Sequence, residues 1–179
     1  MSVTGSNLIQ GPATIYHATF GATEPATIAT APAAPWVDLG GTKDGVEFNI
    51  ADEYAVLDVD QIVYEVERRR VKRVFSVKTN LAEATLENLA RATNNTAPTA
   101  NVLTADDGLT AFNPPYSAIL LDGIAPGGFR RRFIARKTLQ TDAVGTAYKK
   151  DGQTLLPVTF TGHWVSASIK PYITTDAVA

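Results

Sequence analysis

The stretch 68–94 constrains the fold of this chain most, because its hydrophobic period changes there from two residues to about 3.6. In the first half of this stretch, charged or polar side chains stand at most even positions. Apolar side chains recur at odd positions: Val71, Phe75, Val77 and Leu81. This alternation predicts a strand over residues 69–81 with one apolar and one charged face.

A short amphipathic helix over residues 81–92 is predicted to follow this strand directly. Asn80 has a side chain suited to an N-cap, and Glu83, three residues later, completes a capping box. Apolar side chains then recur at helical spacing. The residues expected to pack this helix against the sheet are Leu81, Leu86 and Leu89.

Most of the remaining chain is predicted to form strands separated by turns. Apolar residues alternate with polar ones over residues 46–50, and strand patterns also occupy residues 117–122, 129–141 and 156–164. Residues 43–67 are expected to contain a long loop or hairpin, and residues 94–116 a loop insertion. The predicted fold class is α+β but mainly β, an antiparallel β-sandwich or barrel-forming sheets with one flanking helix.

The two ends of the chain are predicted to lie outside a single domain that spans residues 36–170. Residues 1–35 are expected to form an extended arm, because the run 22–35 is rich in Pro, Ala and Thr. This composition fits a loose terminus and an arm that orders against a neighbouring copy equally well. Residues 171–179 are expected to form a weakly ordered tail.

Composition excludes several classes of function. The 179 residues contain no Cys, which rules out disulfides, thiolate catalysis and sulfur-ligated metals. The net charge of −2 is too small to favour nucleic acid or a membrane as a bulk partner. The sequence shows no signal-peptide pattern at its start and no apolar run long enough to span a membrane.

Recognisable catalytic and metal-binding motifs are missing from the sequence. His17 and His163 lack ligand-like neighbours, and no metalloprotease, hydrolase or phosphate-loop signature occurs. Asp58 and Asp60 lack the further oxygen ligands of a cation cage, and the Asp-Asp-Gly run at 106–108 is typical of a turn. The sequence therefore predicts no enzyme activity, no cofactor and no metal.

Acidic and basic residues are segregated along the chain. Residues 38–67 hold nine acids and one base, whereas residues 68–78 and 130–137 hold eleven of the 16 Lys and Arg. Three interpretations stay open: solvated strand faces that limit aggregation, contacts with phosphates without a stacking pattern, and a head-to-tail interface between copies. On the third interpretation the contact residues are Glu47, Asp52, Glu53, Asp58, Asp60, Glu65, Glu67, Arg68, Arg69, Arg70, Arg73, Arg130, Arg132 and Arg136.

Three short motifs occur in a fixed order in the first half of the chain. They are WVDLG at 36–40 with DGV at 44–46, the acidic DVDQ at 58–61 before a basic strand, and TNLAEATLENL at 79–89. In this order they resemble the major tail proteins, or tail tube proteins, of long-tailed bacteriophages, notably those that infect actinobacteria. The resemblance covers about residues 36–93 and rests beyond them on the order of the elements.

This resemblance implies a structural subunit that closes hexameric rings, which stack into the tube through which DNA leaves the capsid. The implied partners are further copies of the chain and the tail terminator, tape-measure and tail-tip proteins. DNA is implied only as passing cargo, and no membrane partner is implied. The implied location is the virion, after assembly in the host cytoplasm. We further expect residues 47–67 to contact the next ring and the helix to pack outside the barrel.

Two alternatives remain at this stage. The first is a tube or adaptor component of a contractile injection system, which would share the fold and the ring. The second is a monomeric β-sandwich module that binds a ligand such as a carbohydrate, which requires exposed aromatic side chains in a cleft.

A lumen that conducts DNA is expected to repel it weakly, and unpaired arginines at 130, 132 and 136 facing the bore would contradict that expectation.

Overall fold

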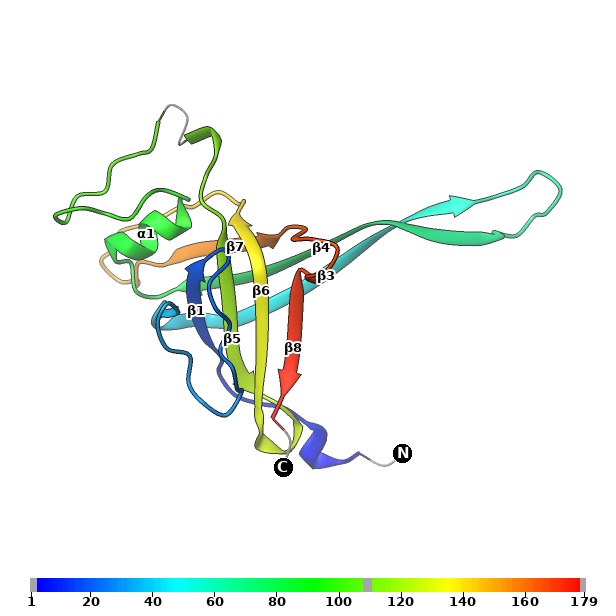
Figure 1. The fold of residues 1–179 in the computed structure, drawn as a ribbon, viewed down its shortest axis with the longest axis horizontal. Coiled ribbons are helices and arrows are strands. Elements are labelled where there is room, and N and C mark those ends of the chain that lie inside the picture. Colours follow the sequence, from blue (N-terminus) through cyan, green and yellow to red (C-terminus); the bar gives the residue numbers. More distant parts are fainter. Residues whose placement is uncertain (1–2, 108–110, 178–179) are drawn as a thin grey trace.

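The computed structural model describes residues 3–107 and 111–177. Within them, eight antiparallel strands form a sheet in which seven follow the order β2-β1-β5-β6-β7-β4-β3, and β8 pairs with β6 off this path (Figure 1). The elements are η1 (Gly5–Asn7), β1 (Thr14–Thr19), β2 (Val37–Asp38), β3 (Thr42–Leu57), β4 (Glu67–Leu81), α1 (Leu86–Ala92), β5 (Ser117–Ile124), η2 (Pro126–Gly128), β6 (Arg130–Gln140), β7 (Leu156–Gly162) and β8 (Tyr172–Asp176). The predicted α+β, mainly β fold class is confirmed.

The sheet folds over itself, so that β1, β5, β6 and β8 face β3, β4 and β7 across the main core. The strand β6 makes this possible, because residues 131–135 pair with β8 while residues 138–140 pair with β7. Figure 1 shows the two groups of strands crossing each other. Across the core the rings of Phe48 and Phe133 approach to 3.9 Å between centroids. The two layers of the sandwich are therefore parts of one hydrogen-bonded sheet.

The strand predicted over residues 69–81 is β4, but its apolar face is buried only in the inner half, residues 74–81, and Val71 of the predicted apolar face is 64% exposed. Phe75, Val77 and Leu81 are all buried in the main core, together with residues of β5, β6 and β7. The outer half of β4, from Glu67 to Arg73, is exposed along its whole length. One strand therefore passes from the core into solvent without a break.

The region 43–67, expected to be a long loop or hairpin, is a hairpin made mostly of strand. β3 continues to Leu57, which pairs with Glu67 of β4, so that only residues 58–66 form the connecting loop. Asp44 and Gly45 occupy an irregularity inside β3, where the register shifts between Lys43 and Val46. The β3–β4 hairpin projects far from the body of the molecule (Figure 1).

The expectation of an extended arm over residues 1–35 needs correction. β1 lies within that range and pairs with β5 from Thr14 to Thr19, and its Ile15 is 0% exposed in the main core. The run 22–35 then crosses back over the outer face of the sheet, where Trp36 Nε1 donates a hydrogen bond to Thr23 O at 2.9 Å. The strand was missed because its six residues carry little alternation and depend on a partner about a hundred residues away.

The helix begins later than the sequence predicted. Thr85, not Asn80, is its N-cap, and the Thr85 hydroxyl accepts a hydrogen bond from Asn88 N at 3.2 Å. Asn80 remains in β4, where Lys43 and Pro157 flank it as register partners. Pairing on both sides of Asn80 keeps the strand conformation, and this outweighs a local capping preference.

The residues expected to pack the helix therefore have different roles. Leu81 is fully buried, but as the last residue of β4. Leu86 is 37% exposed, and Leu89 is the leucine of the helix that packs against the main core. Glu83, expected in a capping box, accepts a hydrogen bond from Gly41 N at 2.9 Å.

The C-terminal residues also differ from expectation. Residues 172–176, expected to be part of a loose tail, form β8 and pair with β6. The strand predicted over residues 156–164 is β7, which lies between β6 and β4 and has Pro157 as its second residue. Trp164, at the end of the predicted range, falls beyond β7 and is 69% exposed.

The position of the N-cap can be tested by two alanine substitutions. Thr85→Ala removes the hydroxyl that caps α1, and we expect it to lower the free energy of unfolding by about 1 kcal/mol. Asn80→Ala removes only an exposed contact of 3.4 Å with Asp44, so a change of less than about 0.5 kcal/mol is expected. Urea unfolding followed by circular dichroism measures both values. A larger loss for Asn80→Ala would contradict the assigned cap.

Candidate functional site

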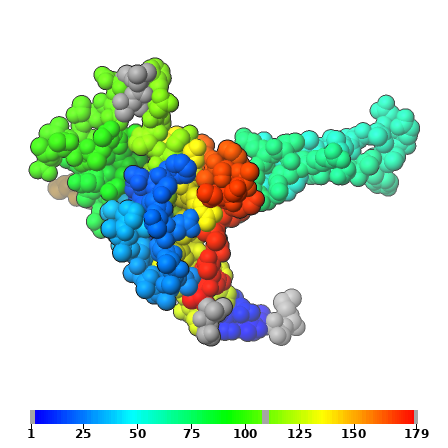
Figure 2. Space-filling view, in the orientation of Figure 1, coloured from blue at the N-terminus to red at the C-terminus, as the bar shows by residue number. Residues whose placement is uncertain are grey.

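The outer part of the β3–β4 hairpin is the most unusual surface of this molecule. Figure 2 shows it extending from the body as a slender arm with open space on both sides. Its loop, residues 58–66, exposes apolar side chains at the far end, including Val63 at 99% and Tyr64 at 83%. An isolated two-stranded hairpin is marginally stable in water, and exposed apolar clusters usually mark interaction sites. We call residues 58–66 the hairpin tip.

Charged residues along the hairpin pair with each other within one chain. Asp52 binds Arg73 through two contacts of 2.6 Å, and Arg70 lies 3.4 Å from the same carboxylate. Lys72 approaches Glu53 at 3.4 Å on the other face. The acidic and basic strands, which one interpretation of the sequence placed on opposite sides of an interface between copies, are thus neighbours in one hairpin.

Near the hairpin tip, ion pairs do not neutralise all of the charged side chains. Arg68 pairs with Glu65, with 2.8 Å between Nη2 and Oε2, and Arg69 lies 3.5 Å from Glu67. Asp58 and Asp60 have no ionic or hydrogen-bonded partner among the described residues. Glu47, nearer the body, stands opposite Lys78 in the register without a close ion pair in the described chain. The tip therefore presents two uncompensated carboxylates beside its apolar side chains.

The hydrogen bonds from Arg73 lower the pKa of Asp52 from 3.8 to about 2, and the nearby charge of Arg70 acts in the same direction. The same pairing raises the pKa of Arg73. Both groups are consequently ionised at any physiological pH, and their contact fixes the pairing of β3 and β4 just outside the body. This contact gives the hairpin a defined base from which it projects.

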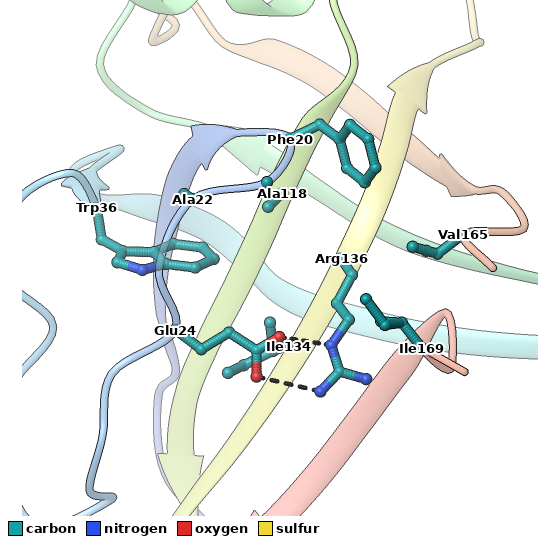
Figure 3. A pocket seen from close by; sticks show the side chains of 10 residues that line it. Phe20, Ala22, Glu24, Trp36, Ala118, Ile134, Arg136, Val165 and Ile169 are labelled. Carbon is teal, nitrogen blue, oxygen red and sulfur yellow. Dashed lines mark hydrogen bonds and ion pairs between the residues drawn. The ribbon is translucent and has the colours of Figure 1, made fainter. Parts of the chain in front are cut away.

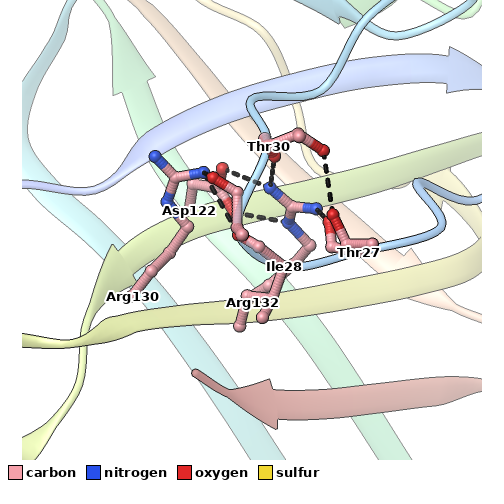
Figure 4. A network of polar contacts seen from close by, with 7 residues as sticks. Thr27, Ile28, Thr30, Asp122, Arg130 and Arg132 are labelled. Atoms are coloured by element: carbon pink, nitrogen blue, oxygen red, sulfur yellow. Dashed lines mark hydrogen bonds and ion pairs between the residues drawn. The ribbon is translucent and has the colours of Figure 1, made fainter. Parts of the chain in front are cut away.

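The arginines of β6, also expected to face a neighbouring copy, bind their own chain. Arg132 is 3% exposed and contacts Asp122 at 2.7 and 2.8 Å through Nε and Nη2. It also donates hydrogen bonds of 2.8 Å to the carbonyl oxygens of Thr27 and Thr30 (Figure 4). Arg130 donates to two further carbonyl oxygens in residues 28–29, at 3.2 Å each. These contacts hold the segment after β1 against the outer face of the sheet.

Arg136 binds the same segment and lines a pocket beside it. Its Nη2 lies 3.1 Å from Glu24 Oε2, and its Nη1 donates to Lys170 O at 2.8 Å. Beside this pair lies a cavity of about 210 Å³, shown in Figure 3. Its lining is mostly apolar: Phe20, Gly21, Ala22, Trp36, Ala118, Ile134, Val165 and Ile169, with Glu24 and Arg136 on one wall. We call it the Phe20–Trp36 pocket.

An aromatic and cationic cluster next to this pocket was not found from the sequence. Lys137 Nζ lies 4.3 Å from the centroid of the Tyr116 ring and 5.4 Å from that of Phe20. His163 meets the Tyr116 ring edge-on, with 5.3 Å between centroids. These residues are far apart in the sequence, so no local pattern joins them. The only local signal was the basic window that contains Lys137.

Two of the residues considered for metal binding, His17 and Asp106, have hydrogen-bond partners. His17 Nε2 lies 2.8 Å from Ser117 Oγ, and burial, with a smaller effect of Arg91, lowers the His17 pKa to about 4. Asp106 accepts hydrogen bonds from the amide and hydroxyl of Thr96, at 2.8 and 2.9 Å. Gly108 of the same motif lies outside the described residues. Over the described ranges, no three His, Asp or Glu side chains gather as metal ligands would.

The arrangement of the described residues fits an interaction protein better than a catalyst. It has a projecting apolar tip, an apolar pocket on the body and ion pairs that join segments of its own chain. No helix in the described part of the chain has the length and apolar character needed to cross a membrane.

Comparison with known protein families identifies a family that spans nearly the whole chain. A family model described as "Phage tail tube protein" matches residues 4–176. No curated protein matches the chain. The family description carries no host, so the resemblance to tail proteins of actinobacterial phages stays a prediction.

The role of Arg132 can be tested against its neighbour on the same strand. Arg132→Ala leaves the Asp122 carboxylate, with a side chain 11% exposed, without its charge partner. We expect a loss of about 3–5 kcal/mol in the free energy of unfolding. Arg131→Ala breaks the Arg131–Asp176 pair, whose side chains are 39% and 40% exposed, and is expected to cost at most about 1 kcal/mol. Equal losses in urea unfolding would contradict the assignment.

The pairing of Asp52 predicts a specific acid response. Because its pKa in the folded chain is depressed, from 3.8 to about 2, the stabilisation from this carboxylate is complete above pH ~4 and is lost as the pH falls towards ~2. Carboxyl ¹³C NMR titration measures the pKa of Asp52 directly. In Arg73→Ala the pKa is expected to rise towards its ordinary value, whereas Arg69→Ala, which removes no contact of Asp52, should leave it unchanged. An unshifted pKa in Arg73→Ala would refute the pairing.

Proposed function

The chain belongs to the phage tail tube protein family, and from this premise we propose that it assembles as hexameric rings that stack around a lumen conducting DNA during ejection. The family match places the chain in the tail of the virion as a structural protein. Ring number, stacking and DNA passage are our proposals. Assembly takes place in the host cytoplasm, before the tail is complete.

The observation that carries this proposal is the uncovered hairpin. Apolar side chains that are 99% and 83% exposed at the end of a long arm are unfavourable in a protein that stays monomeric. They fit a subunit that binds a copy outside its own ring, because the arm extends past the body. We therefore assign the hairpin, including Glu47 to Glu67, to contacts between stacked rings.

The open edges of the sheet support closure into a ring. Of the strands in the main path, β2 and β3 are terminal, and β3 has 16 residues. An exposed edge strand of that length is a template for pairing with another chain. Head-to-tail joining of sheets around a ring removes such edges in every copy.

The charge distribution supports a lumen that does not hold DNA. The arginines at 130, 132 and 136 bind carboxylates and carbonyl oxygens of their own chain. They are therefore not available as a row of unpaired cations, which would bind phosphates tightly and slow the passage of DNA. Tail terminator, tape-measure and tail-tip proteins are the further partners that the family implies.

The direct test is to image the purified protein by negative-stain electron microscopy, with mass photometry on the same sample. Hexameric rings or hollow tubes are expected at high protein concentration. A protein that stays monomeric at all concentrations, and also when a tail-tip complex is added to initiate assembly, would overturn the proposal.

A matched pair of variants tests the role of the hairpin. Val63→Ser with Tyr64→Ser removes the most exposed apolar groups of the tip, and we expect rings that no longer stack into tubes. Tyr148→Ser, which changes an 88% exposed tyrosine away from the hairpin, should stack like the unchanged chain. Sedimentation and electron microscopy distinguish rings from tubes. Normal tube lengths in the double variant would show that the tip does not join rings.

A further inference from the structure

We propose that the Phe20–Trp36 pocket receives the hairpin tip of a second copy of the chain, with Tyr64 as the side chain that enters it. The inference rests on the proposed function, because it names the surface that the hairpin grips. It concerns residues of the body that lie far from the hairpin in sequence, and of those that line the pocket only Arg136 was among the predicted contact residues.

The tip of the same copy cannot fill this pocket. From Ala51 to Leu57, where β3 ends, the hairpin runs six residues outward, which is about 20 Å for a strand, and the loop 58–66 lies beyond that end. The ion pairs of Asp52 with Arg70 and Arg73 fix its direction at the base. Figures 1 and 2 show it pointing away from the body. The occupant must therefore come from another molecule.

The pocket has the chemistry that a tyrosine side chain requires. In Figure 3 the Phe20 and Trp36 side chains lie on two sides of the hollow, with Ala118 and Ile134 beneath and Val165 and Ile169 opposite. The carboxylate of Glu24, whose side chain is 37% exposed, lies on one wall. A tyrosine ring can bury its apolar body in such a site while its hydroxyl donates to the carboxylate. A volume of about 210 Å³ suits one large side chain and not a strand.

Charge complementarity selects the tip as the occupant. Asp58 and Asp60 have no partner in the described chain, and the tip contains no Lys or Arg. Two lysines neighbour residues that line the pocket: Lys137 is held over the Phe20 and Tyr116 rings, and the exposed Lys170 follows Ile169 and lines a second hollow with His163 and Trp164. Neither lysine has a carboxylate partner among the described residues. Two unpaired acids around an aromatic anchor thus match two unpaired bases around an aromatic pocket.

Charge exchange tests this pairing. We expect Asp58→Lys with Asp60→Lys, and separately Lys137→Glu with Lys170→Glu, to raise the protein concentration needed for tube formation on the order of tenfold or more. The chain that carries all four changes restores opposite charges across the contact, so its tube formation should recover. Failure of the fourfold variant to recover, while each pair folds like the unchanged chain by circular dichroism, would overturn the inference.

Cross-linking locates the contact directly, because the chain contains no Cys. Val63→Cys, which keeps Tyr64, and Ile169→Cys are made in separate chains, mixed, assembled and mildly oxidised. A disulfide-linked dimer is expected, since an occupied pocket brings the residue beside Tyr64 within bonding range of position 169. Val63→Cys mixed with Tyr148→Cys, an 88% exposed site away from the pocket, should give none.

The outcomes separate this inference from the proposed function. Tubes without the disulfide between positions 63 and 169, or with equal linking to position 148, refute the pocket as receptor and leave the tube assignment intact. A protein that forms neither rings nor tubes and gives no link refutes both. A small molecule that binds the pocket of the unchanged chain without reducing stacking would also refute it as the receptor for the tip.

Discussion

The structure depends on one strand that occupies two environments. The inner half of β4 is buried through Phe75, Val77 and Leu81, while its outer half is exposed and charged. Because the strand is continuous, the folding energy of the core anchors a hairpin that has no core of its own. The position of the tip is consequently set by the body. A separate flexible loop of the same length would lose far more entropy when it docked on a partner.

Charge pairing within the chain changes how the separation of acids and bases along the sequence is interpreted. The acids before residue 68 and the bases after it are separated along the chain, but the hairpin places them side by side, as in the contacts of Asp52 with Arg73 and of Glu53 with Lys72. The arginines of β6 are used in the same way to hold residues 24–30. Half of the Lys and Arg side chains are used in this way, and the other charges of the described chain remain available to a partner. They include Asp58 and Asp60 on the tip and Lys137 and Lys170 on the body.

Local sequence patterns predicted the elements whose structure depends mainly on neighbouring residues. The alternation over residues 69–81 marks β4 correctly, because one face of that strand packs on the core and the other faces water. The helix start was misplaced because Asn80 has strand partners on both sides, and a capping preference of about 1 kcal/mol does not compete with them. β1 and β8 were missed because both depend on pairing with distant strands. The Phe20–Trp36 pocket joins four separate parts of the chain, so no window of the sequence contains it.

A weak contact at each tip is what the proposed assembly requires. If each tip bound its receptor tightly on its own, free subunits would join into irregular chains before any ring closed, since a head-to-tail contact need not close. A ring presents one tip for each subunit, so its contacts with the next ring form together, and the combined affinity far exceeds that of a single tip. One tyrosine, a few apolar neighbours and two carboxylates suit a single contact that is weak on its own. The uncompensated acids on the tip also repel other tips, which disfavours tip-to-tip aggregation while subunits are free.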